Sequence, residues 1–191
     1  MKSVNISLVG VGGQGTLLAS EILCRTALLA GMDVKKNEVH GMAQRGGSVM
    51  SQVRIADKVY SPLVPTGGTD VLISFEKVEA LRYAHLVSED GICYVNDQEI
   101  RPITVSTGQQ EWPEAIDEKI NSAFGRVKII PALKLAGELG NVKVANLIML
   151  GALSVNTDIP EEIWLEAIKA LVKPKFVEIN LKAFALGREL G

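Results

Sequence analysis

The feature that most constrains the fold is the opening segment, in which a strand runs directly into glycines and then into a helix. The apolar run VNISLVG, residues 4–10, has the length and composition of a buried strand. Leu17, Ile22 and Leu28 then recur at helical spacing, and Gly31 is placed to end the helix. A strand, a tight turn and a helix in this order are typical of α/β proteins.

The rest of the chain repeats this alternation and then becomes helical. The segment 48–55 alternates apolar and polar residues, and with a turn at 56–58 it predicts an antiparallel hairpin that ends near residue 62. Other strands are predicted at residues 33–39, 69–75, 91–96, 101–106 and 126–132, and helices at 76–87, 113–124 and after residue 133. We therefore expect a three-layer α/β/α fold with a mixed, mainly parallel sheet. One domain, residues 1–191, would include a helical C-terminal part from about residue 141.

Charge and hydropathy exclude several classes of protein. The formal net charge is −2 with no basic cluster, which argues against nucleic-acid binding. The most apolar run, residues 144–153, is shorter than the ~20 residues that a membrane span requires. This run is apolar on all sides, so it is expected to be buried in the domain or against another chain. The chain enters its first strand at once without the pattern of a signal peptide, and the cytoplasm is the expected compartment.

The cysteines and histidines limit the cofactors that the chain could hold alone. Cys24 and Cys93 are far apart in apolar runs and are expected to be buried free thiols. An iron–sulfur cluster takes four cysteines. With only His40 and His85 besides, a zinc site also has too few ligands. We therefore expect no metal ligand in this chain.

The glycine loop at the end of the first strand is the first candidate site. Gly10, Gly12 and Gly15 fit the pattern G-x-G-x-x-G, in which the backbone approaches an anion at a helix N-terminus. Glu38 lies near the position of the acidic residue of a dinucleotide site, so a free-standing NAD-dependent oxidoreductase is one interpretation. Gln14 is unusual for such a loop. A third interpretation is that the glycines only form a tight turn.

A second candidate site lies between the predicted strands 33–39 and 48–55. Arg45 carries a planar cation suited to a phosphate or carboxylate, in a loop whose glycines free the backbone. Its candidate residues are His40, Gln44, Arg45, Gly46, Gly47 and Ser48, and those of the first loop are Gly10, Gly12, Gly13, Gln14 and Gly15. If the strands 4–10 and 33–39 are parallel neighbours, both loops emerge at the same carboxyl edge of the sheet.

Four sequence blocks together resemble a known family. They are GVGGQGTLLASEIL, GMDVKKNEVHGMAQRGGSVMSQVR, VYSPLVPTGGTDVLISFEKVEALR and NLIMLGALS. In order and spacing they resemble the small, gamma-type subunits of 2-oxoacid:ferredoxin oxidoreductases over nearly the whole chain. The stretch HGMAQRGGS is similar to the beta subunits of the indolepyruvate branch, whereas pyruvate and oxoglutarate enzymes usually carry a different stretch there.

The resemblance implies a role in the oxidative decarboxylation of a 2-oxo acid to an acyl-coenzyme A with reduction of ferredoxin. It places thiamine diphosphate, Mg²⁺ and 4Fe-4S clusters on a large subunit, with which this chain would assemble. The apolar run at residues 144–153 predicts either this complex or a homodimer. The small subunit would be inactive alone and would carry no catalytic residue. The two loops would then contact coenzyme A or the partner, with Arg45 meeting a phosphate or carboxylate.

Overall fold

The computed structural model describes residues 3–40 and 47–191, and within them six strands form one sheet in the order β2-β3-β1-β4-β5-β6. The strands are β1 (Val4–Val11), β2 (Asp33–His40), β3 (Ser48–Ala56), β4 (Thr69–Ser74), β5 (Val87–Asn96) and β6 (Val127–Ile130). The helices are α1 (Thr16–Leu29), α2 (Lys77–Arg82), α3 (Ile103–Ser106), α4 (Ile116–Ala123), α5 (Ala132–Glu138), α6 (Ala145–Ser154), α7 (Glu161–Leu171) and α8 (Val177–Leu190). Short 3-10 turns span Ala84–Leu86, Val142–Val144 and Pro174–Phe176.

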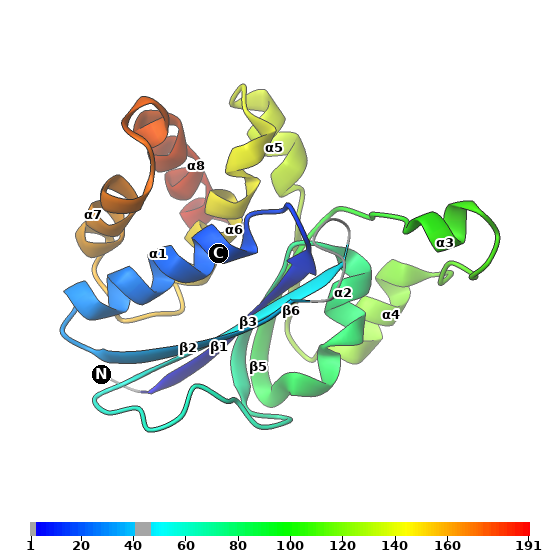
Figure 1. The fold of residues 1–191 in the computed structure, drawn as a ribbon, viewed down its shortest axis with the longest axis horizontal. Coiled ribbons are helices and arrows are strands. Elements are labelled where there is room, and N and C mark those ends of the chain that lie inside the picture. The colour runs from blue at the N-terminus through cyan, green and yellow to red at the C-terminus, as the bar shows by residue number, and fades with distance from the viewer. Residues whose placement is uncertain (1–2, 41–46) are drawn as a thin grey trace.

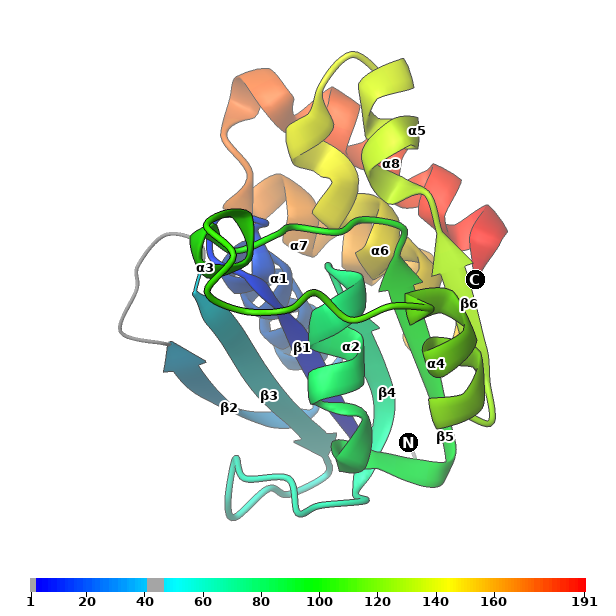
Figure 2. The ribbon, with the colours of Figure 1, turned by 90° about the vertical axis from the view of Figure 1, so that its right-hand side faces the viewer.

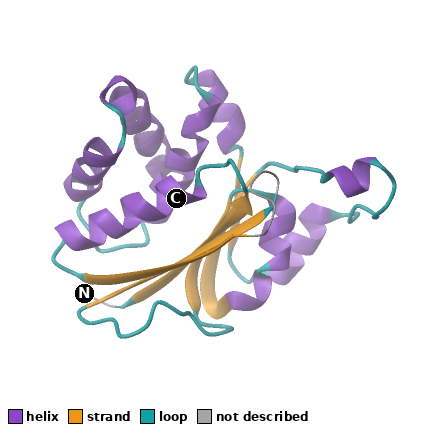
Figure 3. Ribbon diagram, viewed as in Figure 1, coloured by secondary structure: helices purple, strands orange, loops and turns teal. Residues whose placement is uncertain are grey.

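Helices cover both faces of the sheet, which confirms the predicted three-layer α/β/α fold (Figures 1 and 3). Helices α1 and α5 to α8 lie on one face, and α2 and α4 lie on the other. The alternation along β1 sends Leu8 into the larger apolar cluster under α1 and α6, and Val9 into the smaller one under α2 and α4. The sheet is therefore buried on both faces along its central strands.

The sheet is mixed, as predicted, but the antiparallel strand pairs differently from the prediction. Strands β1, β4, β5 and β6 are parallel, and β3 runs antiparallel between β1 and β2. The predicted hairpin of residues 48–62 is therefore wrong, because β3 is already paired on both sides and residues 59–62 form no strand. Instead, the Val59 N–H donates to Asp33 Oδ2 at 2.8 Å, which ties this segment to the start of β2.

The predicted strand at residues 101–106 is also wrong. Its β-branched composition favours a strand locally, but the segment lies away from the sheet and has no strand beside it to pair with (Figure 1). Its backbone closes on itself instead, since the N–H groups of Val105 and Ser106 donate to the Pro102 carbonyl at 3.1 and 3.2 Å. The result is the four-residue helix α3.

Helix α6 is the apolar centre of the C-terminal part. Every residue from Asn146 to Ser154 is buried, between the sheet, α1 and α8. Its burial is thus satisfied within this chain and does not itself require a partner. None of the helices in the described residues is long and apolar enough to cross a membrane.

Two glycines allow α6 and α8 to pack with their backbones in contact. A Cβ on Gly151 would lie 2.2 Å from the Phe184 carbonyl oxygen, and one on Gly187 would lie 2.0 Å from the Ile148 carbonyl oxygen. These atoms belong to helix backbones, so no side-chain rotation relieves the collision.

We expect Gly151→Ala and Gly187→Ala each to lower the free energy of unfolding by roughly 1–3 kcal/mol, because the two helices must separate. Gly137→Ala in α5 is the matched control: its nearest neighbour would be Val142 Cγ1 at 3.8 Å, so helix propensity should raise stability by up to about 1 kcal/mol. Urea denaturation measures all three. A neutral effect at Gly151 and Gly187 would contradict the close helix contact.

Candidate functional site at the carboxyl edge of the sheet

The glycine loop connects the end of β1 to the start of α1. Gly13 and Gly15 have positive φ angles of 107° and 83°, which explains why glycine occupies these two positions. Gly15 is the N-cap of α1 and offers no side-chain cap. Among the described residues, neither the Gly13 nor the Gly15 N–H has an acceptor. The loop therefore presents backbone donors at the positive end of a helix dipole.

Gln14 points inward and holds the loop in place. Its Oε1 accepts from the Val11 N–H at 2.7 Å, and its Nε2 donates to the Phe75 carbonyl at 2.7 Å and to Gln98 Oε1 at 3.0 Å. Both ends of this amide are thus used within the chain. Gln14 was expected to contact a ligand, but its observed contacts are those of a residue that fixes the loop.

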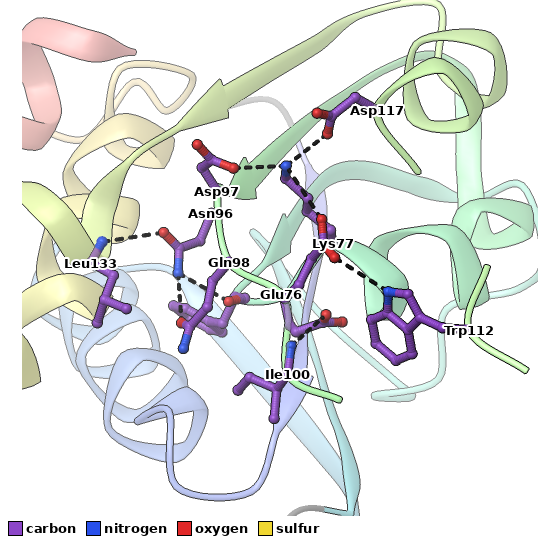
Figure 4. Close-up of polar contacts among 11 residues, drawn as sticks. Glu76, Lys77, Asn96, Asp97, Gln98, Ile100, Trp112, Asp117 and Leu133 are labelled. Carbon is purple, nitrogen blue, oxygen red and sulfur yellow. Dashed lines mark hydrogen bonds and ion pairs between the residues drawn. The ribbon is translucent and has the colours of Figure 1, made fainter. Parts of the chain in front are cut away.

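Asn96 extends the same network across the sheet edge (Figure 4). Its Nδ2 donates to the Phe75 carbonyl at 3.1 Å and to Gln98 Oε1 at 3.0 Å, and its Oδ1 accepts from the Leu133 N–H at 3.3 Å. Side-chain amides thereby join the segments that follow β1, β4, β5 and β6. Such groups would otherwise be buried without partners at the strand ends.

A buried carboxyl and a buried ammonium lie beside this network. Glu76 caps α2: its carboxylate accepts from the N–H groups of Glu79 at 2.8 Å and Ile100 at 3.2 Å. Burial raises the pKa of Glu76, and these backbone hydrogen bonds oppose the rise. Both oxygens of Glu76 are occupied by the chain itself, so the carboxylate serves the fold in this arrangement.

Lys77 joins both ends of the segment between β5 and α4. Its Nζ lies 2.7 Å from Asp97, 2.8 Å from Asp117 and 3.8 Å from Glu99 (Figure 4). Burial lowers the pKa of Lys77, but the hydrogen bonds and charges of Asp117 and Asp97 outweigh that effect and raise it above its ordinary value. The ammonium is therefore held charged at the base of the segment.

The second candidate loop meets the first at the same edge. β1 and β2 run in the same direction but are not neighbours, because β3 lies between them. The Gly12 N–H donates to the Gly47 carbonyl at 2.9 Å. Ser48 donates to Glu79 and is hydrogen-bonded to the Tyr83 hydroxyl at 3.0 Å. The expected meeting of the two loops is confirmed at Gly12 and Gly47, although the strands were expected to be adjacent.

Not all the predicted site residues lie within the described part of the chain. Gln44, Arg45 and Gly46 fall outside it, and His40 is described only as the last residue of β2. Gly10 is the last residue but one of β1 and lies beneath Gln14, where a Cβ would be 2.8 Å from Gln14 Oε1. The structure thus brings together Gly10, Gly12, Gly13, Gln14, Gly15, Gly47 and Ser48.

A cleft opens next to these loops, between α2 and the segment that follows β5. It holds about 200 Å³ and extends from Val11 and Ser48 to Trp112, with Glu76 and Glu79 in its wall. Trp112 lies over this space, and its Nε1 donates to Glu99 at 3.2 Å. The cleft therefore combines an aromatic surface with hydrogen-bonding groups at the edge where open α/β sheets bind ligands.

The two cysteines are free thiols, as predicted, and lie on opposite faces of the sheet. Cys93 is fully buried under α2 and α4, as predicted, but Cys24 is only half-buried on α1, because it lies beside Lys36 and Glu38 of the edge strand β2. Burial raises the pKa of Cys24 to about 11 and raises that of Cys93 further. Within residues 3–40 and 47–191, no three His, Cys, Asp or Glu side chains are grouped as metal ligands would be. The described residues do not fit an iron–sulfur cluster.

The fold and loops can now be compared with known proteins. The model of the family described as pyruvate ferredoxin/flavodoxin oxidoreductase matches residues 5–190. The chain belongs to this family. It is 44% identical to the indolepyruvate oxidoreductase subunit IorB of Pyrococcus horikoshii and 43% identical to that of Thermococcus kodakarensis, in each case over 98% of this chain and 95% of the relative.

Solved structures of the family share the fold. The gamma subunit of a keto/oxoacid ferredoxin oxidoreductase from Geobacter sulfurreducens matches with a TM-score of 0.72 and 25% identity, over 97% of this chain and 96% of that one. The pyruvate oxidoreductase subunit PORC from Thermotoga maritima matches with a TM-score of 0.74 and 25% identity, over 100% and 97%. The present chain is therefore a subunit of a 2-oxoacid:ferredoxin oxidoreductase, and its glycine loop lies at the carboxyl edge of the sheet described above.

The alternative of a free-standing NAD-dependent oxidoreductase is not supported. Glu38, the candidate for the acidic residue of a dinucleotide site, is paired with Lys36 at 2.6 Å and accepts a hydrogen bond from Ser20 Oγ at 3.3 Å. The strand after β2 is antiparallel and follows without a crossover helix in the described residues, unlike the parallel order of a dinucleotide fold. The family assignment agrees with this geometry.

The sequence analysis missed the residues that organise this edge. Glu76, Lys77, Asn96 and Gln98 were not candidates, although each lies at the end of a buried strand or shortly after it. Polar side chains at that place in an α/β sheet are the signal that could have identified them. Their mutual contacts depend on the order of strands in space.

We expect Gln14→Ala to lower the free energy of unfolding by roughly 1–3 kcal/mol, because the Val11 N–H, the Phe75 carbonyl and Gln98 Oε1 each lose a partner. The exposed Gln109→Ala is the control and should change stability little. Urea denaturation monitored by circular dichroism makes the comparison. Equal stability of the two variants would show that the amide network does not hold the loop.

Proposed function

We propose that this chain is the small subunit of an indolepyruvate-type 2-oxoacid:ferredoxin oxidoreductase, which converts an aryl 2-oxo acid to its acyl-coenzyme A and reduces ferredoxin. The supporting observation is the similarity over nearly the whole chain to subunits named IorB, at 42–44% identity in three archaea. The 2-oxoglutarate synthase subunits KorC match at 31–32%. A fourth IorB, from Methanothermobacter thermautotrophicus, also matches at 31%, so the substrate assignment rests on the first three.

The catalytic cofactors are proposed to lie on a large subunit. The family reaction depends on thiamine diphosphate for decarboxylation and on iron–sulfur clusters for electron transfer. The described residues of this chain offer two cysteines on opposite faces of the sheet and no metal-ligand group, which supports a partner that carries both cofactors. This chain would then complete a site that the large subunit begins.

The contribution of this chain is proposed to be a binding surface for coenzyme A at the two loops. The N–H groups of Gly13 and Gly15 are available at the N-terminus of α1, where a phosphate is favoured. Arg45 would add a bidentate cation from the second loop, which is hydrogen-bonded to the first at Gly47. Arg45 itself lies outside the described residues, so its role is argued from the sequence.

Reconstitution tests the proposed function. The isolated chain should show no oxidation of 2-oxo acids and should contain no iron, whereas addition of a cognate large subunit should give coenzyme A-dependent reduction of ferredoxin. Indolepyruvate should be used with a higher kcat/KM than pyruvate or 2-oxoglutarate. Stoichiometric iron in the isolated chain, or activity without the large subunit, would contradict the proposal.

The role of Arg45 has its own test. In the reconstituted complex, Arg45→Ala should raise the KM for coenzyme A by about tenfold to a hundredfold, because a charge-assisted hydrogen bond is lost, and Arg45→Lys should be intermediate. Lys58→Ala is the control, since Lys58 is an exposed cation that follows β3 at the opposite edge of the sheet. If Arg45→Ala assembles and binds coenzyme A like the wild type, the loop is not part of the site.

A further inference from the structure

The strand β2 forms a long edge of the sheet. Its eight residues pair with β3 in an unbroken antiparallel register from Asp33↔Ala56 to His40↔Val49. On its other side, no strand of the described chain pairs with it, and no helix lies beside it in the plane of the sheet (Figure 2). Its outward N–H and C=O groups are therefore a template for another strand.

The usual devices that protect an edge strand are weak here. β2 contains no proline, and its register shows no bulge. Its two lysines are balanced by Asp33 and Glu38, so it carries no net charge to repel a similar strand. Val39, at its outer end, is 48% exposed.

The charges of β2 complement those of a second copy of the same strand in one register. In an antiparallel pair, residues directly opposite one another point to the same face of the sheet. A two-fold axis perpendicular to the sheet leaves each residue on its own face, so it must pass beside one residue of β2 and not between two. An axis at Asn37 puts Lys36 of each copy opposite Glu38 of the other. An axis at Lys36 or at Glu38 would instead place like charges opposite one another.

Helix α1 supplies an apolar surface next to the same axis. Leu17 and Leu28 are 44% and 55% exposed. Ser20 Oγ donates to Glu38, which places a residue before the middle of α1 beside a residue after the middle of β2. Because α1 runs antiparallel to β2, the middles of the two elements then lie alongside one another. Leu17 and Leu28 are placed almost symmetrically about that point in the sequence. The two-fold axis at Asn37 therefore brings Leu17 of one copy toward Leu28 of the other.

The spacing of the layers agrees with this arrangement. α1 contacts both β2 and β3, so its axis lies above the space between them. Strands are about 4.8 Å apart, which puts α1 and its symmetry copy roughly 10 Å apart across the new strand pair. That distance is close to the 8–10 Å at which helices pack.

We propose that β2 is a homodimer interface, in which two copies of this chain join their sheets antiparallel about Asn37 and pack their α1 helices together. The surface shares His40 with the second candidate loop, at the end of β2, but the dimer does not depend on the proposed reaction. Lys36 and Glu38, which already pair within one copy at 2.6 Å, become a four-charge cluster across the axis. The occupant is a second copy of this chain and not a strand of the large subunit.

The test is a charge exchange followed by sedimentation velocity on the full chain. The wild type should sediment as a dimer. Lys36→Glu and Glu38→Lys should each weaken dimerisation by roughly tenfold or more, because two attractive pairs become repulsive. An equimolar mixture of the two variants should regain the dimer, since the introduced glutamate of one variant then faces the introduced lysine of the other. The double variant K36E/E38K should dimerise alone.

Controls separate this interface from a general loss of charge or of folding. Lys182→Glu also breaks an ion pair within one copy, that between Lys182 and Glu178 on the exposed side of α8, and it should leave the dimer intact. Leu17→Lys should weaken the dimer, and circular dichroism should show each variant folded. A monomeric wild type, single variants that remain dimers, or a mixture that does not associate would each overturn the proposal. Association of β2 only with the large subunit would overturn it as well.

Discussion

One glutamine side chain, Gln14, determines how the functional edge of this sheet is built. The parallel strands end in backbone groups that the sheet itself does not pair, and an amide can both accept and donate hydrogen bonds. Gln14 accepts from the last residue of β1 and donates to the residue that follows β4, and Gln98 and Asn96 continue the connection to β5 and β6. The positions of four loops thus depend on one group of amides.

The glycine loop consequently has two kinds of residue with different duties. Gln14 and Gly10 face the interior, where the amide needs the space that a side chain at Gly10 would fill. No heavy atom of residues 3–40 and 47–191 lies within 4 Å of the position that a Cβ on Gly13 would take, whereas Gly15 lies against Asn146 of α6. The G-x-G-x-x-G pattern, which is typical of dinucleotide-binding sites, therefore occurs here in a sheet that differs from a dinucleotide fold, because an antiparallel strand lies beside β1.

Much of the fold was predictable because it is determined locally. The apolar runs of β1, β4 and β5 and the periodicity of α1 identify buried elements without knowledge of their neighbours. The partner of β3 was not predictable in this way, because its alternating pattern fits any antiparallel neighbour. Residues 59–62 were chosen as that neighbour for their closeness in sequence, whereas β1 and β2 take both sides. The meeting of the two loops followed from strand direction, but the Asn96 and Lys77 contacts required the spatial order of the strands.

The contacts of Lys77 have an evolutionary consequence. The segment after β5 leaves the sheet near Asp97 and returns near Asp117, and one ammonium pairs with both. Because entry and exit are held together, residues between them can be inserted, deleted or replaced while β5, α4 and the sheet stay in register. Related subunits can therefore diverge in the length and composition of this segment at little thermodynamic cost.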